Sequence, residues 1–164
     1  MSMSFDSSAA RRPRVVAYDS DEFQQVVDDI PEALRGGDGM VCLFVGASHE
    51  EKQEGLTKVS ASQELNLHRF RVPNLIGERL VETQGHLREA FDHAGEDAAV
   101  LFFDEADVLL APTDAEDADE DDAALSDYFF DRVEAYHGVS IVCFSSNEYA
   151  DRLEGHDADV VVEF

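Results

Sequence analysis

Basic residues are scarce in this chain. Its 164 residues include 12 Lys and Arg against 37 Asp and Glu, which gives a formal net charge of −25. A surface this acidic argues against binding to a nucleic-acid backbone or to an anionic membrane. Lysine occurs only as Lys52 and Lys58, and such a composition is typical of a protein that works in molar salt. There the Debye length is about 3 Å, so repulsion between surface carboxylates is screened. A role as an acidic decoy for cationic partners is the alternative explanation.

Cysteines and long apolar runs are scarce as well. Cys42 and Cys143 are the only cysteines, and both lie in apolar stretches of strand length. We therefore expect buried free thiols and no disulfide framework. The chain has no run of about 18 apolar residues, which a transmembrane helix requires. The apolar stretch that follows the basic residues 11–14 is too short for a signal peptide. We expect a soluble, cytoplasmic protein.

The composition allows one folded domain. Apolar residues make up 44% of the chain, which is enough for a core. Residues 1–19 begin with a Ser-rich stretch without periodicity, so we expect a disordered or loosely attached lead. Residues 20–164 are predicted to form a single domain. Within it, residues 111–122 are predicted to be a mobile acidic loop, because like charges repel one another. A calcium site there is disfavoured, since the turn Gly and ligand spacing of an EF-hand are missing.

Short apolar runs alternate with amphipathic stretches throughout this domain. Continuous apolar strands that alternate with helices are typical of a parallel sheet covered on both faces. Strands are predicted at residues 41–45, 67–72, 98–103, 139–144 and 159–164. Helices are predicted at residues 20–34, 52–65, 78–94 and 123–136.

Two carboxylates follow one of the buried strands. Val100 to Phe103 is wholly apolar and runs directly into Asp104 and Glu105. Ligands of open α/β sheets bind at the carboxyl ends of the strands, where these two side chains would lie. In nucleoside triphosphatases the Asp holds Mg²⁺ and the Glu acts on the attacking water. An acidic helix start in an acidic chain is the alternative interpretation.

Part of a phosphate-loop pattern follows the strand at 41–45. The pattern is a Gly, four residues, a second Gly, a Lys and then Ser or Thr. Gly46 and Lys52 stand at the required spacing. Glu51 replaces the second Gly, and Gln53 replaces the Ser or Thr. Half of the pattern is therefore present.

The order of these segments resembles that of the AAA ATPases, from about Gly36 to Phe164. Phe103 to Asp107 is similar to the family's magnesium and catalytic-Glu segment. Asn147 falls where the family keeps a sensor Asn that contacts the γ-phosphate or the attacking water. The resemblance implies a three-layer α/β domain of the P-loop NTPase type. It implies a five-stranded parallel sheet in the order 5-1-4-3-2, with helices on both faces.

Two departures from the family pattern affect the expected nucleotide site. Glu51 brings a carboxylate toward the triphosphate, with Glu50 beside it. Two like unit charges about 4 Å apart repel by roughly 4 kcal/mol at an effective dielectric constant of 20. Gln53 cannot replace a hydroxyl in the same Mg²⁺ geometry, because its amide oxygen lies one methylene further out.

Three further departures lie outside the phosphate loop. Leu75 stands where ring translocases usually place an aromatic side chain. The stretch from His156 to Asp159 lacks the arginine finger that the family keeps before its last strand, a group that can supply several orders of magnitude in rate. The chain stops at Phe164, so we expect no helical lid. Together these losses predict inefficient ATP hydrolysis by this chain alone.

Two functional hypotheses remain. The first is a pseudo-ATPase that acts as a scaffold or regulator of a partner, either an intact AAA ATPase or another protein. The second is a weak enzyme or nucleotide sensor that binds ATP and Mg²⁺. It would use Gly46, Lys52 and Gln53 for the nucleotide, Asp104 for the metal, and Glu105 and Asn147 for catalysis.

Overall fold

The computed structural model describes residues 14–36, 39–46, 48–61, 67–77, 79–95, 100–109, 120–144 and 158–164. Its strands are β1 (Arg14–Ala17), β2 (Met40–Val45), β3 (Leu67–Arg71), β4 (Val100–Asp104), β5 (Val139–Phe144) and β6 (Val160–Glu163). Its helices are α1 (Asp21–Gly36), α2 (His49–Ala61), α3 (Val72–Leu75), α4 (Leu80–Gly95) and α5 (Glu120–Ala135), with a 3₁₀ turn η2 at Ala106–Leu109.

The six strands found among the described residues belong to one parallel sheet in the order β1-β6-β2-β5-β4-β3. Without β1, this order is the predicted 5-1-4-3-2, so the fold class is confirmed. The predicted number of five strands is wrong. The sixth strand, β1, lies within the stretch that we expected to be a loose lead, and it pairs with β6 from Arg14↔Val160 to Ala17↔Glu163. Four residues without clear alternation give little signal in the sequence. Residues 1–13 lie outside the described residues.

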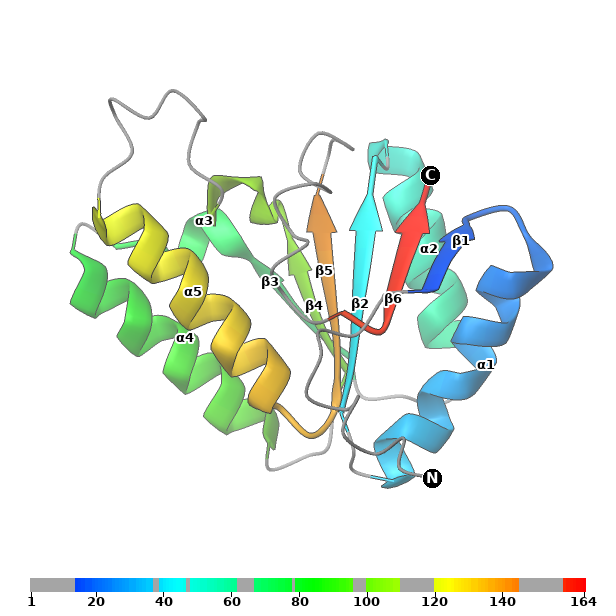
Figure 1. Cartoon of the computed structure of the whole chain (residues 1–164), viewed down its shortest axis with the longest axis horizontal. Coiled ribbons are helices and arrows are strands. Elements are labelled where there is room, and N and C mark those ends of the chain that lie inside the picture. Colours follow the sequence, from blue (N-terminus) through cyan, green and yellow to red (C-terminus); the bar gives the residue numbers. More distant parts are fainter. Residues whose placement is uncertain are drawn as a thin grey trace, which may run out of the picture.

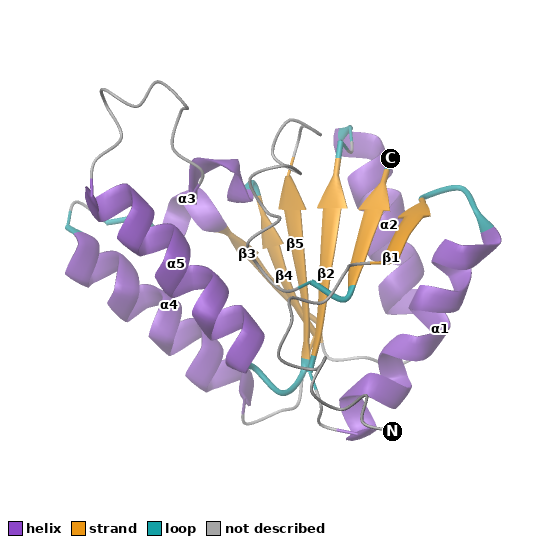
Figure 2. Ribbon diagram, in the orientation of Figure 1, coloured by secondary structure: helices purple, strands orange, loops and turns teal. Residues whose placement is uncertain are grey.

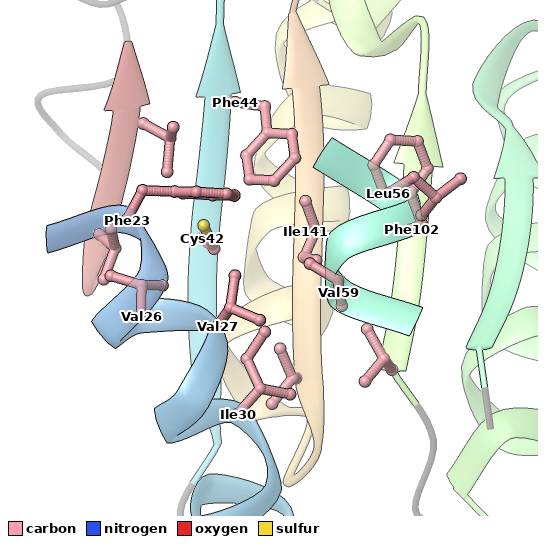
Figure 3. Close-up of a cluster of buried hydrophobic side chains, with 14 of the residues drawn as sticks. Phe23, Val26, Val27, Ile30, Cys42, Phe44, Leu56, Val59, Phe102 and Ile141 are labelled. Carbon is pink, nitrogen blue, oxygen red and sulfur yellow. The ribbon is translucent and has the colours of Figure 1, made fainter. Parts of the chain in front are cut away.

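The sheet separates two apolar layers, with α1 and α2 on one face and α4 and α5 on the other (Figures 1 and 2). Successive residues of a strand point to opposite faces, so each buried strand contributes to both layers. In β4, Phe102 packs toward α1 and α2, while Leu101 and Phe103 pack toward α4 and α5. Figure 3 shows the first of these layers, in which side chains of α1 and α2 lie over β2, β5 and β4: Phe23, Val26, Val27, Ile30, Cys42, Phe44, Leu56, Val59, Phe102 and Ile141.

Helices α1 and α4 agree with the sequence pattern to within two residues, whereas α2 and α5 each begin three residues before their predicted starts. For α1, the Ser20 hydroxyl accepts a hydrogen bond from Phe23 N at 3.3 Å, as expected of an N-terminal cap. However, α2 begins at His49, three residues before the predicted start at Lys52. At the other end of the chain, α5 includes residues 120–122 of the predicted acidic loop, and residues 111–119 lie outside the described residues. In the part of the chain that the structure describes, no helix is long and apolar enough to cross a membrane.

Candidate functional site

The end of β4 places two carboxylates in different surroundings. Every residue of this strand is buried, and Asp104 is only 3% exposed. Around Phe103, the rings of Phe70, Phe91 and Phe129 lie with centroids 5.6, 5.3 and 5.0 Å away, which fixes the strand end in the core. The chain then turns at Glu105, which has a φ of +56°, a conformation rarely adopted by residues other than Gly. As a result Asp104 is held inside the protein and Glu105 faces solvent.

The carboxylate of Asp104 makes a direct ion pair with Lys52. The Lys52 ammonium lies 2.8 Å from Asp104 Oδ1, and the lysine side chain is 14% exposed. Lys52 belongs to the second turn of α2, and Figure 1 shows that α2 starts beside the carboxyl end of β2. The structure therefore brings together the predicted phosphate-binding lysine and the predicted metal ligand. They contact each other.

A second cation, which the sequence analysis missed, binds the same carboxylate. The Arg69 guanidinium donates from Nη2 to Asp104 Oδ2 at 2.8 Å. Arg69 lies on β3, the strand next to β4, in register with Phe102. Burial by itself would raise the pKa of Asp104, but the contacts with Arg69 and Lys52 outweigh burial and lower it below its usual value. Asp104 is therefore an ionised carboxylate with a cation on each oxygen.

Arg69 also forms hydrogen bonds with Gln53, which the second hypothesis assigns to nucleotide binding. When the Gln53 amide is oriented to satisfy its neighbours, its oxygen accepts from Arg69 Nη1 at 3.1 Å and from Nη2 at 2.8 Å. Gln53 therefore binds the arginine that is bound to Asp104. We call Lys52, Gln53, Arg69 and Asp104 the Asp104 cluster.

The predicted catalytic carboxylate is paired too. Arg71 lies two residues after Arg69 on β3, and its Nε donates to Glu105 Oε2 at 2.7 Å. Both side chains of this pair are about half exposed, at 55% and 44%, so water screens the interaction. The basic residues at alternate positions of β3 could have been noticed in the sequence, because basic residues are so rare in this chain.

The segment expected to form the phosphate loop starts a helix instead. Gly46 turns the chain with a φ of +80°, and its N–H donates to Phe144 O at 3.1 Å. The Ser48 hydroxyl accepts from Glu51 N, and the Glu51 carboxylate accepts from Ser48 N, both at 3.2 Å. This reciprocal arrangement is a capping box. It satisfies two backbone N–H groups at the start of α2 with the chain's own side chains, and it places an anion at the helix N-terminus, where negative charge is favourable.

Other predicted positions lie away from this cluster. Leu75 packs partly buried against the core beside α4 and α5. The Asp159 carboxylate accepts from Val41 N at 2.8 Å, beside the amino end of β2, so its charge caps backbone at the other end of the sheet. Asn147 and residues 156–157 lie outside the described residues.

Comparison with known proteins supports the fold and the family. A sequence model of the family described as "ATPase family associated with various cellular activities (AAA)" matches residues 55–156, more than half of the chain. The chain belongs to the AAA family. The match begins after the degenerate phosphate-loop segment at 46–53. A search of curated proteins finds no match.

A solved structure shares the fold of this AAA domain. It is described as the structure of the E. coli MS115-1 HORMA:CdnC:Trip13 complex, and the similarity has a TM-score of 0.65 at 12% sequence identity. The alignment covers 88% of this chain and 62% of that chain, so this chain spans less than two thirds of the length of its structural neighbour.

A magnesium nucleotide, which AAA domains generally bind, does not fit the arrangement of this site. Both oxygens of Asp104 are taken by cations, and Gln53 binds one of those cations. The Glu51 carboxylate accepts a hydrogen bond from Ser48 N, a backbone group that would otherwise be free to bind a phosphate.

Proposed function

We propose that this chain is a non-hydrolysing AAA domain that acts as a scaffold or regulator of a protein partner. The observation that carries the proposal is the pair of cations on Asp104, with Lys52 lying 2.8 Å from Oδ1 and Arg69 lying 2.8 Å from Oδ2. In a working site the lysine and the aspartate hold the phosphates and the Mg²⁺. Here Lys52 and Arg69 each bind one oxygen of Asp104, so a metal ion would have to displace a cation of the protein.

The capping box supports the same proposal from a different segment. The N–H of Ser48 and the N–H of Glu51 are both satisfied within the chain. A phosphate at this helix end would compete with the Glu51 carboxylate and be repelled by it. Binding would therefore require this turn to open at the same time as the ion pair at Lys52.

Protein partners fit this role better than a small-molecule substrate. The solved structure that shares the fold is itself a complex of several proteins. An intact AAA ATPase is one candidate partner, and another protein is the alternative. We place this activity in the cytoplasm at high salt, because the net charge of −25 is best tolerated where salt screens it.

A weak Mg-ATP binder or nucleotide sensor is the second candidate. It is favoured by the retention of Lys52 and Asp104 at the positions that the family pattern gives them. In that case ATP and Mg²⁺ would displace the ion pair, and Glu105 and Asn147 would contact the nucleotide or the water.

Titration of Mg-ATP in molar KCl separates the two candidates. We expect no saturable binding by the wild type at millimolar ATP, measured by isothermal calorimetry. Saturable binding that Lys52→Ala abolishes would overturn the scaffold proposal and establish the sensor. Lys58→Ala is the matched control, because Lys58 is the other lysine of α2 and its ammonium lies over the Tyr18 ring, 4.5 Å from the centroid.

A further inference from the structure

Both oxygens of one buried carboxylate are bound by cations from separate elements. Lys52 reaches Asp104 Oδ1 from α2, and Arg69 reaches Oδ2 from β3, each at 2.8 Å. A lysine beside this aspartate belongs to the family pattern, but the arginine on the second oxygen is an additional charge. The positive charge next to this aspartate therefore comes from two side chains of the protein, Lys52 and Arg69.

Arg69 is held in this position by more than its ion pair. Its guanidinium carbon lies 5.8 Å from the centroid of the Phe102 ring, and the Gln53 amide oxygen accepts from its nitrogens. The parallel register of β3 against β4 places Arg69 opposite Phe102. The side chain is 36% exposed, so about two thirds of its surface is covered by the protein. Such a guanidinium is preorganised for the carboxylate.

A divalent cation on Asp104 would have to replace this arginine. Mg²⁺ binds carboxylate oxygens at about 2.0 to 2.1 Å and requires near-octahedral oxygen ligands. The oxygens of Asp104 face an ammonium and a guanidinium, and the Gln53 oxygen faces the same guanidinium. Like charges would repel the metal, and the ligand oxygens would already be in use.

We propose that Arg69 is a built-in counter-ion that takes the place of the divalent cation on Asp104 and excludes metal from it. This inference rests on the proposed function, because a site closed to metal is one that does not turn over a magnesium nucleotide. It assigns the closure to one side chain. Arg71 provides the comparison, since it follows on the same strand and binds the exposed Glu105.

Paramagnetic Mn²⁺ tests the proposal without nucleotide. We would titrate the ¹⁵N-labelled full chain in molar KCl, where weak binding to the acidic surface is screened, and follow broadening of amide signals. In the wild type, we expect the signals around Asp104 to broaden no more than those of surface carboxylates elsewhere. In Arg69→Ala, we expect selective broadening around Asp104 at a Mn²⁺ concentration at least tenfold lower. Arg71→Ala should behave as the wild type does.

The outcomes separate this inference from the function on which it rests. Selective broadening around Asp104 in the wild type, or none in a folded Arg69→Ala protein, would overturn the counter-ion proposal. If Arg69→Ala does not fold, Arg69→Gln removes the charge and retains a hydrogen-bond donor, and it should show the same gain. Adding Asp104→Asn to either variant should abolish the gain. Because ATP is absent, these results do not depend on whether Lys52 binds nucleotide.

Discussion

The phosphate-loop segment at 46–53 and the end of β4 at 103–105 differ in how much of the family pattern they retain. The first has lost its second Gly and its hydroxyl, whereas the second reads almost unaltered. In the structure, however, groups of the chain itself bind the key residues of both segments. Glu51 binds backbone within its own turn, and Asp104 binds two cations from neighbouring elements. A retained motif therefore shows only that the side chains are present. Whether they are free for a ligand depends on their partners.

The capping box and the Asp104 ion pairs also differ in how far apart their residues lie along the chain. The capping box joins Ser48 to Glu51, which are three residues apart, and one helix turn is enough to form it. The Asp104 ion pairs join residues that are far apart in the chain, and they form only after α2, β3 and β4 have packed. Removing the capping box and removing the ion pairs should therefore lower the free energy of unfolding by different amounts.

The largest effect is expected from Asp104→Ala, which leaves two cations without their shared partner. Removing one member of a buried ionic group usually costs about 3 to 5 kcal/mol, and because Arg69 is partly exposed we expect about 2 to 3 kcal/mol. Urea unfolding at constant KCl concentration would measure the loss. Glu105→Ala, which removes the neighbouring exposed carboxylate, should change stability little. Equal losses in the two variants would mean that the buried ion pairs are no stronger than the exposed one.

Lowering the pH removes the charge of Asp104 gradually, and we expect it to lower the free energy of unfolding by less than Asp104→Ala does. The pKa of Asp104 is lower in the folded protein than its ordinary value, so the unfolded chain takes up this proton first as pH falls. The stability that Asp104 contributes is thus complete above its ordinary pKa and is lost as pH falls through the lower, folded value. Subtracting the profile of Asp104→Asn from that of the wild type removes the effect of the other carboxylates. The difference should be constant near neutral pH and shrink in acid, and a difference that grows in acid would contradict the sign of the shift.

The smallest effect is expected from Glu51→Ala, which removes half of the capping box. Loss of such a cap usually costs about 1 kcal/mol. Glu50→Ala is the control, since it removes one negative charge from the same turn and leaves the Ser48 hydrogen bonds in place. Urea unfolding of both variants, compared at the same salt concentration, isolates the cap from the charge. A loss for Glu50→Ala as large as that for Glu51→Ala would show that charge alone matters.

Much of the fold could be predicted from the sequence. The apolar runs that became β2, β4 and β5 are buried along most or all of their length, and such runs stand out in any chain. The edge strand β1 was missed, because it has four residues and only Val16 among them is buried. The early start of α2 was missed as well, although Ser48 and Glu51 are spaced as a capping box requires. The segment was interpreted as a phosphate loop, so the helix was predicted to begin only at Lys52.

The candidate site was predicted only in part. Lys52, Gln53, Asp104 and Glu105 all lie at the carboxyl edge of the sheet, and Gly46 turns the chain there. The roles assigned to them stay predictions. The cations on the two carboxylates were not foreseen, because an arginine on an edge strand is usually exposed to solvent. Only the pairing of β3 with β4 places Arg69 and Arg71 beside these carboxylates.

By itself, the sequence determined the layered α/β architecture and the AAA resemblance, because burial and secondary structure depend on the type and spacing of the residues. It also determined the formal net charge of −25. Only the tertiary structure decided whether Lys52 and Asp104 were available to a ligand, since ion pairs depend on distances between elements remote in the chain. Those distances follow from strand order and helix packing, and they bring Arg69 and Lys52 to within 2.8 Å of the same carboxylate.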